Sequence, residues 1–191
     1  MFGCGQYYVN GIGVAADVGA AFSWFMRAAE AGNVNAQFGL GYCYRDGAGV
    51  AADAAAAVKW FTRSAEAGHA DAQYNLGDCY HDGKGVAADA AAAVKWFMRA
   101  VDAGHADAMN SLAVCYSAGT GVAVDFAKSI ALFTRAAEAG HAIAQYNLGA
   151  RYLEGSCGVA CDVAKARELF SRSAAGGDTD AAALLAALDA R

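Results

Sequence analysis

The chain repeats itself with a period of 36 residues. Residues 36–71 and 72–107 are nearly the same string, and the stretch from Gly49 to Phe61 recurs without change from Gly85 to Phe97. A period of about 20 to 50 residues is typical of proteins in which each repeat packs only against its neighbours. The predicted repeats are 1–35, 36–71, 72–107, 108–143 and 144–180, and the last holds one extra residue near Ser156. Residues 181–191 follow them.

Each repeat has two segments with helical spacing. Ala72, Leu76 and Tyr80 lie at i, i+4 and i+8, which places them on one face of a first helix that Gly83 ends. Asp89 lies at the N-cap position of a second helix, where its carboxylate would accept hydrogen bonds from the free amides of that helix.

The second helix has apolar residues at i, i+3, i+4 and i+7. In the third repeat these are Ala93, Trp96, Phe97 and Ala100. This spacing predicts that the ring pair packs against the first helix, and that Trp60 and Trp96 are largely buried.

Four positions are the same in all five repeats: a tyrosine of the first helix, a valine of the connection, the capping aspartate and a phenylalanine of the second helix. One helical hairpin cannot cover its own apolar faces, so neighbouring hairpins must bury them. We therefore predict an all-α fold, a single solenoid domain of five helix-turn-helix repeats. A terminal helix over about 181–190 would cap it with Leu184, Leu185 and Leu188.

Composition excludes several classes of protein. Apolar residues make up 57% of the chain, but no unbroken apolar run of about 20 residues is present, so we expect no membrane insertion. The net charge of −5 disfavours a nucleic-acid-binding protein. Residues 1–4 show no basic and no apolar segment of a secretory signal, and a cytoplasmic location is the expectation.

The repeat resembles the Sel-one-like repeat family, a relative of the tetratricopeptide repeat. The matching positions within one repeat are Ala72, Leu76, Gly77, Tyr80, Gly83, Gly85, Val86, Asp89, Ala93, Trp96 and Gly104. The resemblance implies a right-handed superhelix whose first helices line a concave surface, and it implies an adaptor that holds other proteins together. Ala113 in the glycine position and Leu132 and Leu169 in the tryptophan position depart from the family pattern.

Histidines and cysteines recur with the repeat. His69, His105 and His141 share one turn position, and equivalent atoms of successive repeats should lie about 10 Å apart, too far to share a metal ion. We expect capping or solvated histidines and no metal or other cofactor. By the same spacing, Cys43, Cys79 and Cys115 should be free thiols that pack as small apolar groups.

Two further sets of residues stay open. Cys157 and Cys161 flank the extra residue of the last repeat and form either a bridge or a plain loop pair. Arginines recur on the second helices, commonly with an acid three residues later, as in Arg63 and Glu66. They form either solvated ion pairs or a basic binding stripe.

The best candidate site lies on the first helices. Phe38, Tyr74, Asn110 and Tyr146 share one position, and Tyr42, Asp78, Arg45 and His81 follow one and two turns later. Aromatic rings beside varied polar groups suit peptide capture, although these rings could instead pack between repeats. The candidate partner-binding residues are Phe38, Tyr42, Arg45, Asp46, Tyr74, Asp78, His81, Asp82, Asn110 and Tyr146.

The leading hypothesis is a non-catalytic scaffold that binds a peptide or protein segment on this concave face. The alternative is an enzyme, because a cysteine-rich branch of the same family includes penicillin-binding, β-lactam-hydrolysing members. That branch pairs cysteines within each repeat, whereas repeats two to four here have one cysteine each.

Overall fold

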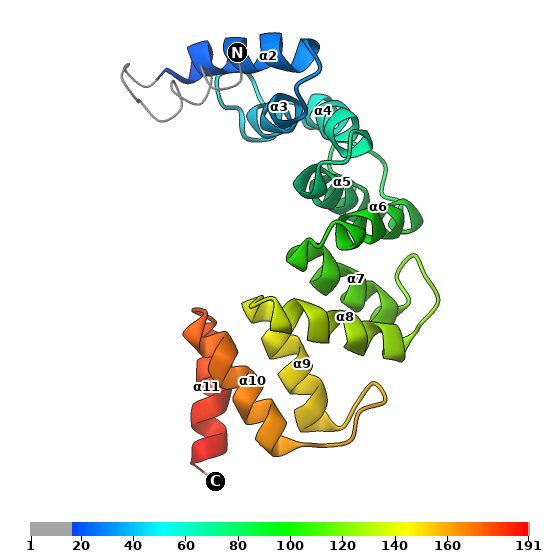
Figure 1. Ribbon diagram of the computed structural model, residues 1–191, viewed down its shortest axis with the longest axis vertical. Coiled ribbons are helices and arrows are strands. Elements are labelled where there is room, and N and C mark those ends of the chain that lie inside the picture. Colours follow the sequence, from blue (N-terminus) through cyan, green and yellow to red (C-terminus); the bar gives the residue numbers. More distant parts are fainter. Residues whose placement is uncertain (1–16, 191) are drawn as a thin grey trace. The chain divides into compact units, whose positions relative to one another are not determined.

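The computed structural model describes residues 17–190, and over this range the chain is helical with no strand. The second helices of repeats 1 to 5 are α2 (Val18–Glu30), α4 (Ala54–Glu66), α6 (Ala90–Asp102), α8 (Phe126–Glu138) and α10 (Val163–Ala175). The first helices of repeats 2 to 5 are α3 (Val34–Asp46), α5 (Ala70–Asp82), α7 (Ala106–Ala118) and α9 (Ala142–Glu154), and α11 (Thr179–Asp189) follows (Figure 1). The predicted first helix of repeat 1 lies outside the described residues.

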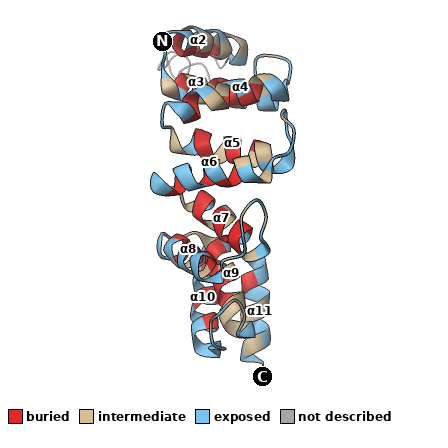
Figure 2. Ribbon diagram, turned by 90° about the vertical axis from the view of Figure 1, so that its right-hand side faces the viewer, coloured by how far each residue is buried: buried red, intermediate tan, exposed pale blue. Residues whose placement is uncertain are grey.

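The helices group into two compact units. The first unit is described from residue 17 to Ala100 and the second from Val101 to residue 190. In both, buried residues follow one side of the repeat helices and exposed residues the other (Figure 2). This pattern confirms the helical spacing that the sequence indicates.

The helices begin at side-chain caps. The side chain of Asp53 accepts a hydrogen bond from the backbone amide of Ala56 at 2.9 Å, and that of Asp89 accepts one from the amide of Ala92 at the same distance. The first helices use other residues, because Asn33, His69, His105 and His141 cap α3, α5, α7 and α9. Each cap satisfies an amide that the helix itself leaves without a partner.

Two glycines shape the connection between α5 and α6. Gly83 ends α5 in the left-handed conformation, with φ of 71°. Gly85 also has a positive φ, 73°, and a Cβ atom there would lie 2.1 Å from the carbonyl oxygen of Ala54. The connection therefore packs directly against the start of the second helix of the preceding repeat.

Two clusters of buried residues in the first unit are each shared by neighbouring repeats. One joins α2 to α3 and includes Phe25 and Leu40, and the other joins α4 to α5 and includes Phe61 and Leu76. Within a hairpin, a Cβ atom on Gly77 would lie 2.5 Å from the ring of Phe97. Glycine at this position thus allows close approach of the two helices.

Trp60 and Trp96 are partly buried and each packs against a core cluster, in line with the prediction, while the adjacent Phe61 and Phe97 are fully enclosed. Trp60 packs with one side against the α2–α3 cluster. Phe61 and Phe97 face the other helix of their own hairpin. The tryptophan before each phenylalanine lies at the edge of that contact surface.

The terminal helix has the predicted contacts. Leu184, Leu185 and Leu188 of α11 pack against the cluster of Ala166, Phe170 and Ala181. Asp178 caps α11 and also accepts a hydrogen bond from Ser173 Oγ at 2.9 Å, which ties the helix to α10. The cap helix begins two residues before the predicted 181.

Candidate functional site

Phe38 and Tyr42 lie one turn apart on α3, and both are half-buried. Their rings meet edge to face with centroids 4.8 Å apart, and they reach Phe61 at 6.0 and 5.6 Å. Phe38 also stacks on the imidazole of His69 at 4.4 Å. These aromatic rings are therefore partly packed within the first unit and partly open.

Arg45 is held in place by three groups. Its guanidinium lies 4.0 Å from the centre of the Tyr42 ring and makes two hydrogen bonds to Asp46, Nε to Oδ1 at 2.7 Å and Nη2 to Oδ2 at 3.0 Å. Its Nη1 donates to Oδ1 of Asn75 on α5 at 3.3 Å. The hydrogen bonds from Arg45 keep the pKa of the Asp46 carboxyl below its usual value. The contact with Asn75 links α3 to α5, the first helices of two successive repeats.

Asp78 is a half-buried carboxylate on α5. Burial raises its pKa, and the negative charge of Asp82 adds to this effect. A hydrogen bond from the Tyr74 side chain works in the opposite direction. The Tyr74 ring itself packs against Phe97, with centroids 5.9 Å apart. The hydrogen bond from Tyr74 therefore only partly offsets the cost of burying the ionised Asp78 carboxylate.

His81 and Asp82 end α5 at the surface. Nδ1 of His81 lies 2.8 Å from Oδ1 of Asp82, and Nζ of Lys84 donates to Oδ2 of Asp82 at 2.7 Å. The Lys84 hydrogen bond, followed by that of His81, lowers the pKa of the Asp82 carboxyl. The polar end of the candidate site is therefore a network of opposite charges.

Asn110 and Tyr146 belong to the second unit. Asn110 accepts a hydrogen bond from Nδ2 of Asn147 at 3.0 Å, and the Tyr146 ring packs on Phe170 with centroids 5.7 Å apart. The sequence allowed the Tyr146 ring either to pack between repeats or to bind a peptide. In the structure this ring contacts Phe170, the core phenylalanine of its own repeat.

Asn75 and Asn147 make side-chain hydrogen bonds between repeats that the sequence analysis missed. Asn75 accepts from Arg45, and Asn147 donates to Asn110. Both follow the aromatic residue in the string Tyr-Asn-Leu-Gly, which occurs at 74–77 and 146–149. The recurrence of this string was the signal available in the sequence.

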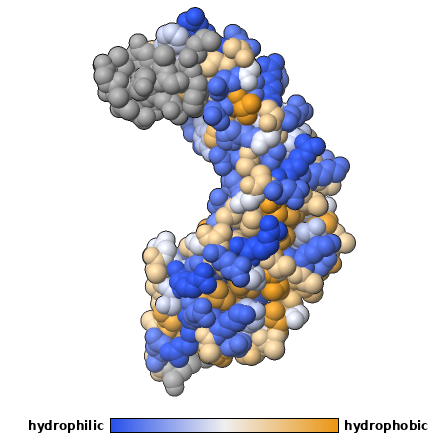
Figure 3. Space-filling view, viewed as in Figure 1, coloured by the Kyte–Doolittle hydropathy of each residue, from blue (hydrophilic) through white to orange (hydrophobic). Residues whose placement is uncertain are grey.

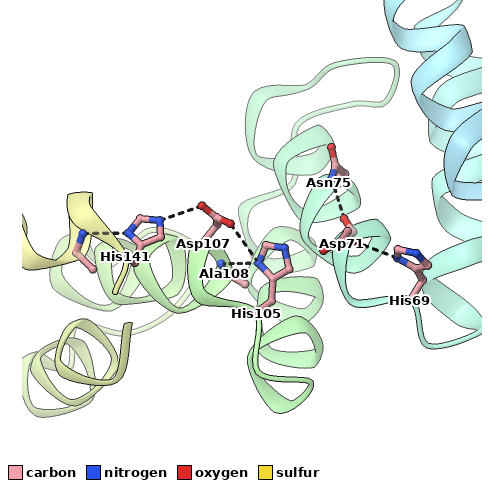
Figure 4. A network of polar contacts seen from close by, with 8 residues as sticks. His69, Asp71, Asn75, His105, Asp107, Ala108 and His141 are labelled. Atoms are coloured by element: carbon pink, nitrogen blue, oxygen red, sulfur yellow. Dashed lines mark hydrogen bonds and ion pairs between the residues drawn. The ribbon is translucent and has the colours of Figure 1, made fainter. Parts of the chain in front are cut away.

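The histidine positions are structural (Figure 4). Nδ1 of His141 accepts the amide of Ala144 at 3.1 Å, and Nε2 lies 2.9 Å from Oδ1 of Asp107. His69 and His105 cap their helices in the same way. The capping expectation is confirmed.

The cysteines of the first helices are buried and free, as predicted. Burial raises the pKa of the Cys43, Cys79 and Cys115 thiols. A raised pKa keeps a thiol protonated and weakly nucleophilic at neutral pH. Cys157 is half-buried with φ of 56°, and Cys161 is exposed with Sγ 3.3 Å from the Leu153 carbonyl oxygen.

Three arginines of the second helices, Arg27, Arg63 and Arg99, pack on a tryptophan ring, which was neither of the two alternatives left open by the sequence. The guanidinium of Arg63 lies over the ring of Trp60, 4.7 Å from its centre. Among residues 17–190 no ion pair joins Arg63 to Glu66. The ring three residues earlier offers a flat surface on which a planar cation packs, and this contact replaces the ion pair.

Within the described range, no group of three or more histidine, cysteine, aspartate or glutamate side chains is arranged to hold a metal ion. Nor does that range contain a helix of the length and apolar character that crossing a membrane requires.

Comparison with known proteins gives a clear family match. The Sel1 repeat model matches residues 1–33, 34–69, 70–105, 106–141 and 142–178, the predicted period in a register two residues earlier. A search of curated proteins finds no match.

Two solved structures are similar over nearly the whole chain. One is a protective antigen of uropathogenic Escherichia coli with an SLR fold, at 36% identity and a TM-score of 0.91. That alignment covers 96% of this chain and 39% of the antigen, so this chain spans well under half of its relative. The other is a Sel1 repeat protein from Oxalobacter formigenes, at 32% identity and a TM-score of 0.90, covering 95% and 72% of the two chains. An immunity protein from Pseudomonas aeruginosa, at 20% identity and a TM-score of 0.59 over 94% of this chain and 68% of its own, shares the fold.

Proposed function

Because the chain belongs to the Sel1 repeat family, whose members are generally protein-interaction scaffolds, we propose that it binds a protein segment without catalysing a reaction. The proposed binding surface, called the first-helix surface, lies on α3 and α5 of the first unit. It consists of Phe38, Tyr42, Arg45, Asp46, Tyr74, Asp78, His81 and Asp82. Asn110 and Tyr146 are the proposed contacts in the second unit.

The observation that carries the proposal is the position of Asp78. Its carboxyl is half-buried and its pKa is raised by burial, so the ionised form costs folding free energy. The same repeat position holds Tyr42, Val114 and Ala150, so the fold does not require a carboxylate there. A charge kept at a cost to stability is typical of a binding surface.

The neighbouring groups supply what a peptide needs. Phe38, Tyr42 and Tyr74 offer partly open rings, which are the side chains that contribute most to protein interfaces. Arg45 is fixed by Tyr42, Asp46 and Asn75, so little conformational entropy is lost when a ligand contacts it. Apolar and hydrophilic residues are interspersed over the visible face of the molecule (Figure 3). This mixture favours a peptide that has its own polar pattern.

The full chain, immobilised, should capture a partner from a lysate of the source organism, which mass spectrometry then identifies. With the purified partner, Asp78→Val and Arg45→Ala should each raise Kd about tenfold in calorimetry. Asp78→Val introduces the residue that the fourth repeat already has, so the variant should stay folded. Arg135→Ala, on an exposed arginine of α8, is the matched control and should leave Kd unchanged. An unchanged Kd for both folded variants would place the binding surface elsewhere.

The enzyme alternative has a separate test. The family is typically non-catalytic, and the buried thiols on the first helices have raised pKa values, which disfavours them as nucleophiles. Incubation of the full chain with a fluorescent penicillin should give no covalent adduct and no hydrolysis. Turnover that follows enzyme concentration would contradict the scaffold proposal.

A further inference from the structure

The second helices of the first unit carry a repeated pair of a tryptophan and an arginine. The guanidinium carbons of Arg27, Arg63 and Arg99 lie 4.8, 4.7 and 4.6 Å from the ring centres of tryptophans three residues earlier. Lysine precedes two of these tryptophans. The set is called the tryptophan ladder and consists of Trp24, Arg27, Lys59, Trp60, Arg63, Lys95, Trp96 and Arg99.

The cations of the ladder have no anionic partner. Over residues 17–190, no carboxylate lies within ion-pair distance of the ladder's arginines and lysines, whereas Arg45, Lys84 and Lys128 each pair with an aspartate. Lys95 and Arg99 are exposed and lie one turn apart on α6. Glu30, Glu66 and Asp102 follow the three arginines by three residues without pairing with them, so, among the described residues, unpaired cations lie beside aromatic rings in a chain with a net charge of −5.

A hollow of about 400 Å³ lies on this surface. It is lined by Tyr80, Ala92, Lys95, Trp96, Met98 and Arg99. Two aromatic rings, a methionine and two cations therefore surround it, and no carboxylate does. The volume falls within the range of pockets that accept a small ligand or a large side chain, roughly 300–1,000 Å³.

The small side chain of Ala92 leaves room for the hollow. The equivalent residue is Lys128 in the fourth repeat and Lys165 in the fifth. Those lysines extend over the tyrosine of their own repeat, with Nζ 5.2 Å from the Tyr116 ring centre and 4.3 Å from that of Tyr152. Alanine at position 92 leaves the space above Tyr80 open.

The second unit lacks the same combination. Its tryptophan positions hold Leu132 and Leu169, which are buried. A hollow of about 120 Å³ in the second unit shares four of the equivalent lining positions, Lys165, Glu168, Leu169 and Arg172, but has no tyrosine in its lining and includes two glutamates, Glu138 and Glu168. The ladder is thus a property of the first unit and not a requirement of the repeat.

We propose that the tryptophan ladder binds an acidic segment of a partner protein, and that the hollow above Tyr80 accepts an apolar side chain of that segment. Charge complementarity selects the acidic residues, because Lys59, Lys95 and the arginines have no internal anion to displace. Desolvation of the Tyr80 and Trp96 rings by an apolar side chain supplies affinity. This surface is separate from the first-helix surface, so the proposal stands or falls independently of the one above.

The probe is a fluorescein-labelled peptide in which one phenylalanine is flanked on both sides by glutamates. Its binding to the full chain is measured by fluorescence anisotropy at about 50 mM salt, where surface charges are weakly screened. A serine in place of the phenylalanine should raise Kd about fivefold or more, and lysines in place of the glutamates should abolish binding.

Three variants locate the site. Lys95→Glu should raise Kd about tenfold. Ala92→Lys fills the hollow as Lys128 and Lys165 do, and should raise Kd about fivefold although it adds a positive charge; Ala92→Leu fills it without charge and should do the same. Arg135→Glu changes the net charge as Lys95→Glu does, in the second unit, and should leave Kd within about twofold.

Several results would overturn the proposal. Unchanged or tighter binding by Ala92→Lys and Ala92→Leu would exclude the hollow. An equal loss with Arg135→Glu would show that only net charge matters. Absence of peptide binding at millimolar concentration would exclude the acidic segment. Tighter binding of oligothymidine, lost in Lys95→Glu, would reassign the ladder to single-stranded nucleic acid, which also combines rings and cations.

Discussion

The imidazole of His141 joins two repeats, since Nε2 lies 2.9 Å from Oδ1 of Asp107 while Nδ1 accepts the Ala144 amide at 3.1 Å. This arrangement fits the tautomer with its proton on Nε2, which then donates to Asp107. One side chain thus caps α9 and links it to α7. Asn33 caps α3 at the equivalent position with a shorter side chain.

The two roles of His141 can be separated by substitution. His141→Asn keeps a cap and loses the contact with Asp107, so it should lower the free energy of unfolding by about 0.5–1 kcal/mol. His141→Ala loses both and should cost about 1–2 kcal/mol. Urea denaturation of these variants with and without Asp107→Ala measures the coupling. Additive effects of His141→Asn and Asp107→Ala would show that the contact contributes nothing.

Gly85 should be much less tolerant of substitution than Gly104, although both have positive φ. An added Cβ at Gly85 would collide with the backbone of Ala54, whereas Gly104 has nothing within 4 Å. We expect Gly104→Ala to cost about 1–2 kcal/mol from the left-handed conformation alone. Gly85→Ala should cost about 3 kcal/mol or more, because an element must also move. Equal thermal midpoints for the two variants would contradict this packing.

Asp78→Asn should stabilise the protein at neutral pH. Since burial raises the folded-state pKa of Asp78, the ionised carboxylate destabilises the folded state, and this penalty appears as pH rises through that pKa. Below the unfolded pKa of about 3.9, Asp78 is protonated in both states and the penalty is absent. Urea midpoints should therefore be higher for Asp78→Asn at pH 7 and equal to the parent at pH 3. A lower midpoint at pH 7 would mean that the carboxylate is fully compensated.

Trp60 is half-buried, and its truncation should cost less than that of an enclosed ring. We expect Trp60→Ala to lower the free energy of unfolding by about 2–3 kcal/mol, below the 3–5 kcal/mol typical of buried aromatic residues. Trp60→Leu introduces the residue found at 132 and 169 and should cost about 1 kcal/mol. Phe61→Ala, at a fully enclosed ring, is the comparison and should exceed both in guanidinium titration. A larger loss for Trp60→Ala than for Phe61→Ala would contradict this order.

Deletion of residues 179–191 should leave Phe170 and Ala166 without the cover of Leu184, Leu185 and Leu188. An uncapped end of a repeat array exposes an apolar face, so we expect self-association. Light scattering coupled to gel filtration measures it. The control is Leu184→Glu, which keeps the helix and weakens its apolar contacts. A truncated chain that stays monomeric would exclude the capping role.

Much of the fold could be predicted because the same residue types recur at the same structural positions in each repeat. The aspartate before the second helix, the glycine after the first and the enclosed phenylalanine each satisfy a local requirement that one repeat already contains. Trp60 and Arg63 could not be placed with the same certainty. Two partners compete for the arginine at spacing i±3, a ring on one side and Glu66 on the other, and tertiary packing decides between them.

The candidate site was harder to predict than the fold. A ring on the first helix can face a ligand or its own hairpin partner, and Phe38 and Tyr74 divide their surface between the two. The link from Arg45 to Asn75 depends on the distance between repeats, which no single repeat encodes. The sequence shows the small side chain at Ala92, but the hollow above Tyr80 also depends on how Tyr80 and Trp96 pack, which the sequence alone does not give.

The core clusters of the first unit each join a second helix to the first helix of the next repeat. For protein engineering, an inserted window must consequently span one full period of 36 residues, such as 53–88, so that it supplies a second helix and the following first helix in register. A gene duplication of any window of one period still supplies one helix of each kind and regenerates every internal contact. Arrays of this kind can therefore grow or shrink by recombination without a crossover at a privileged boundary, and only the terminal helix must be retained.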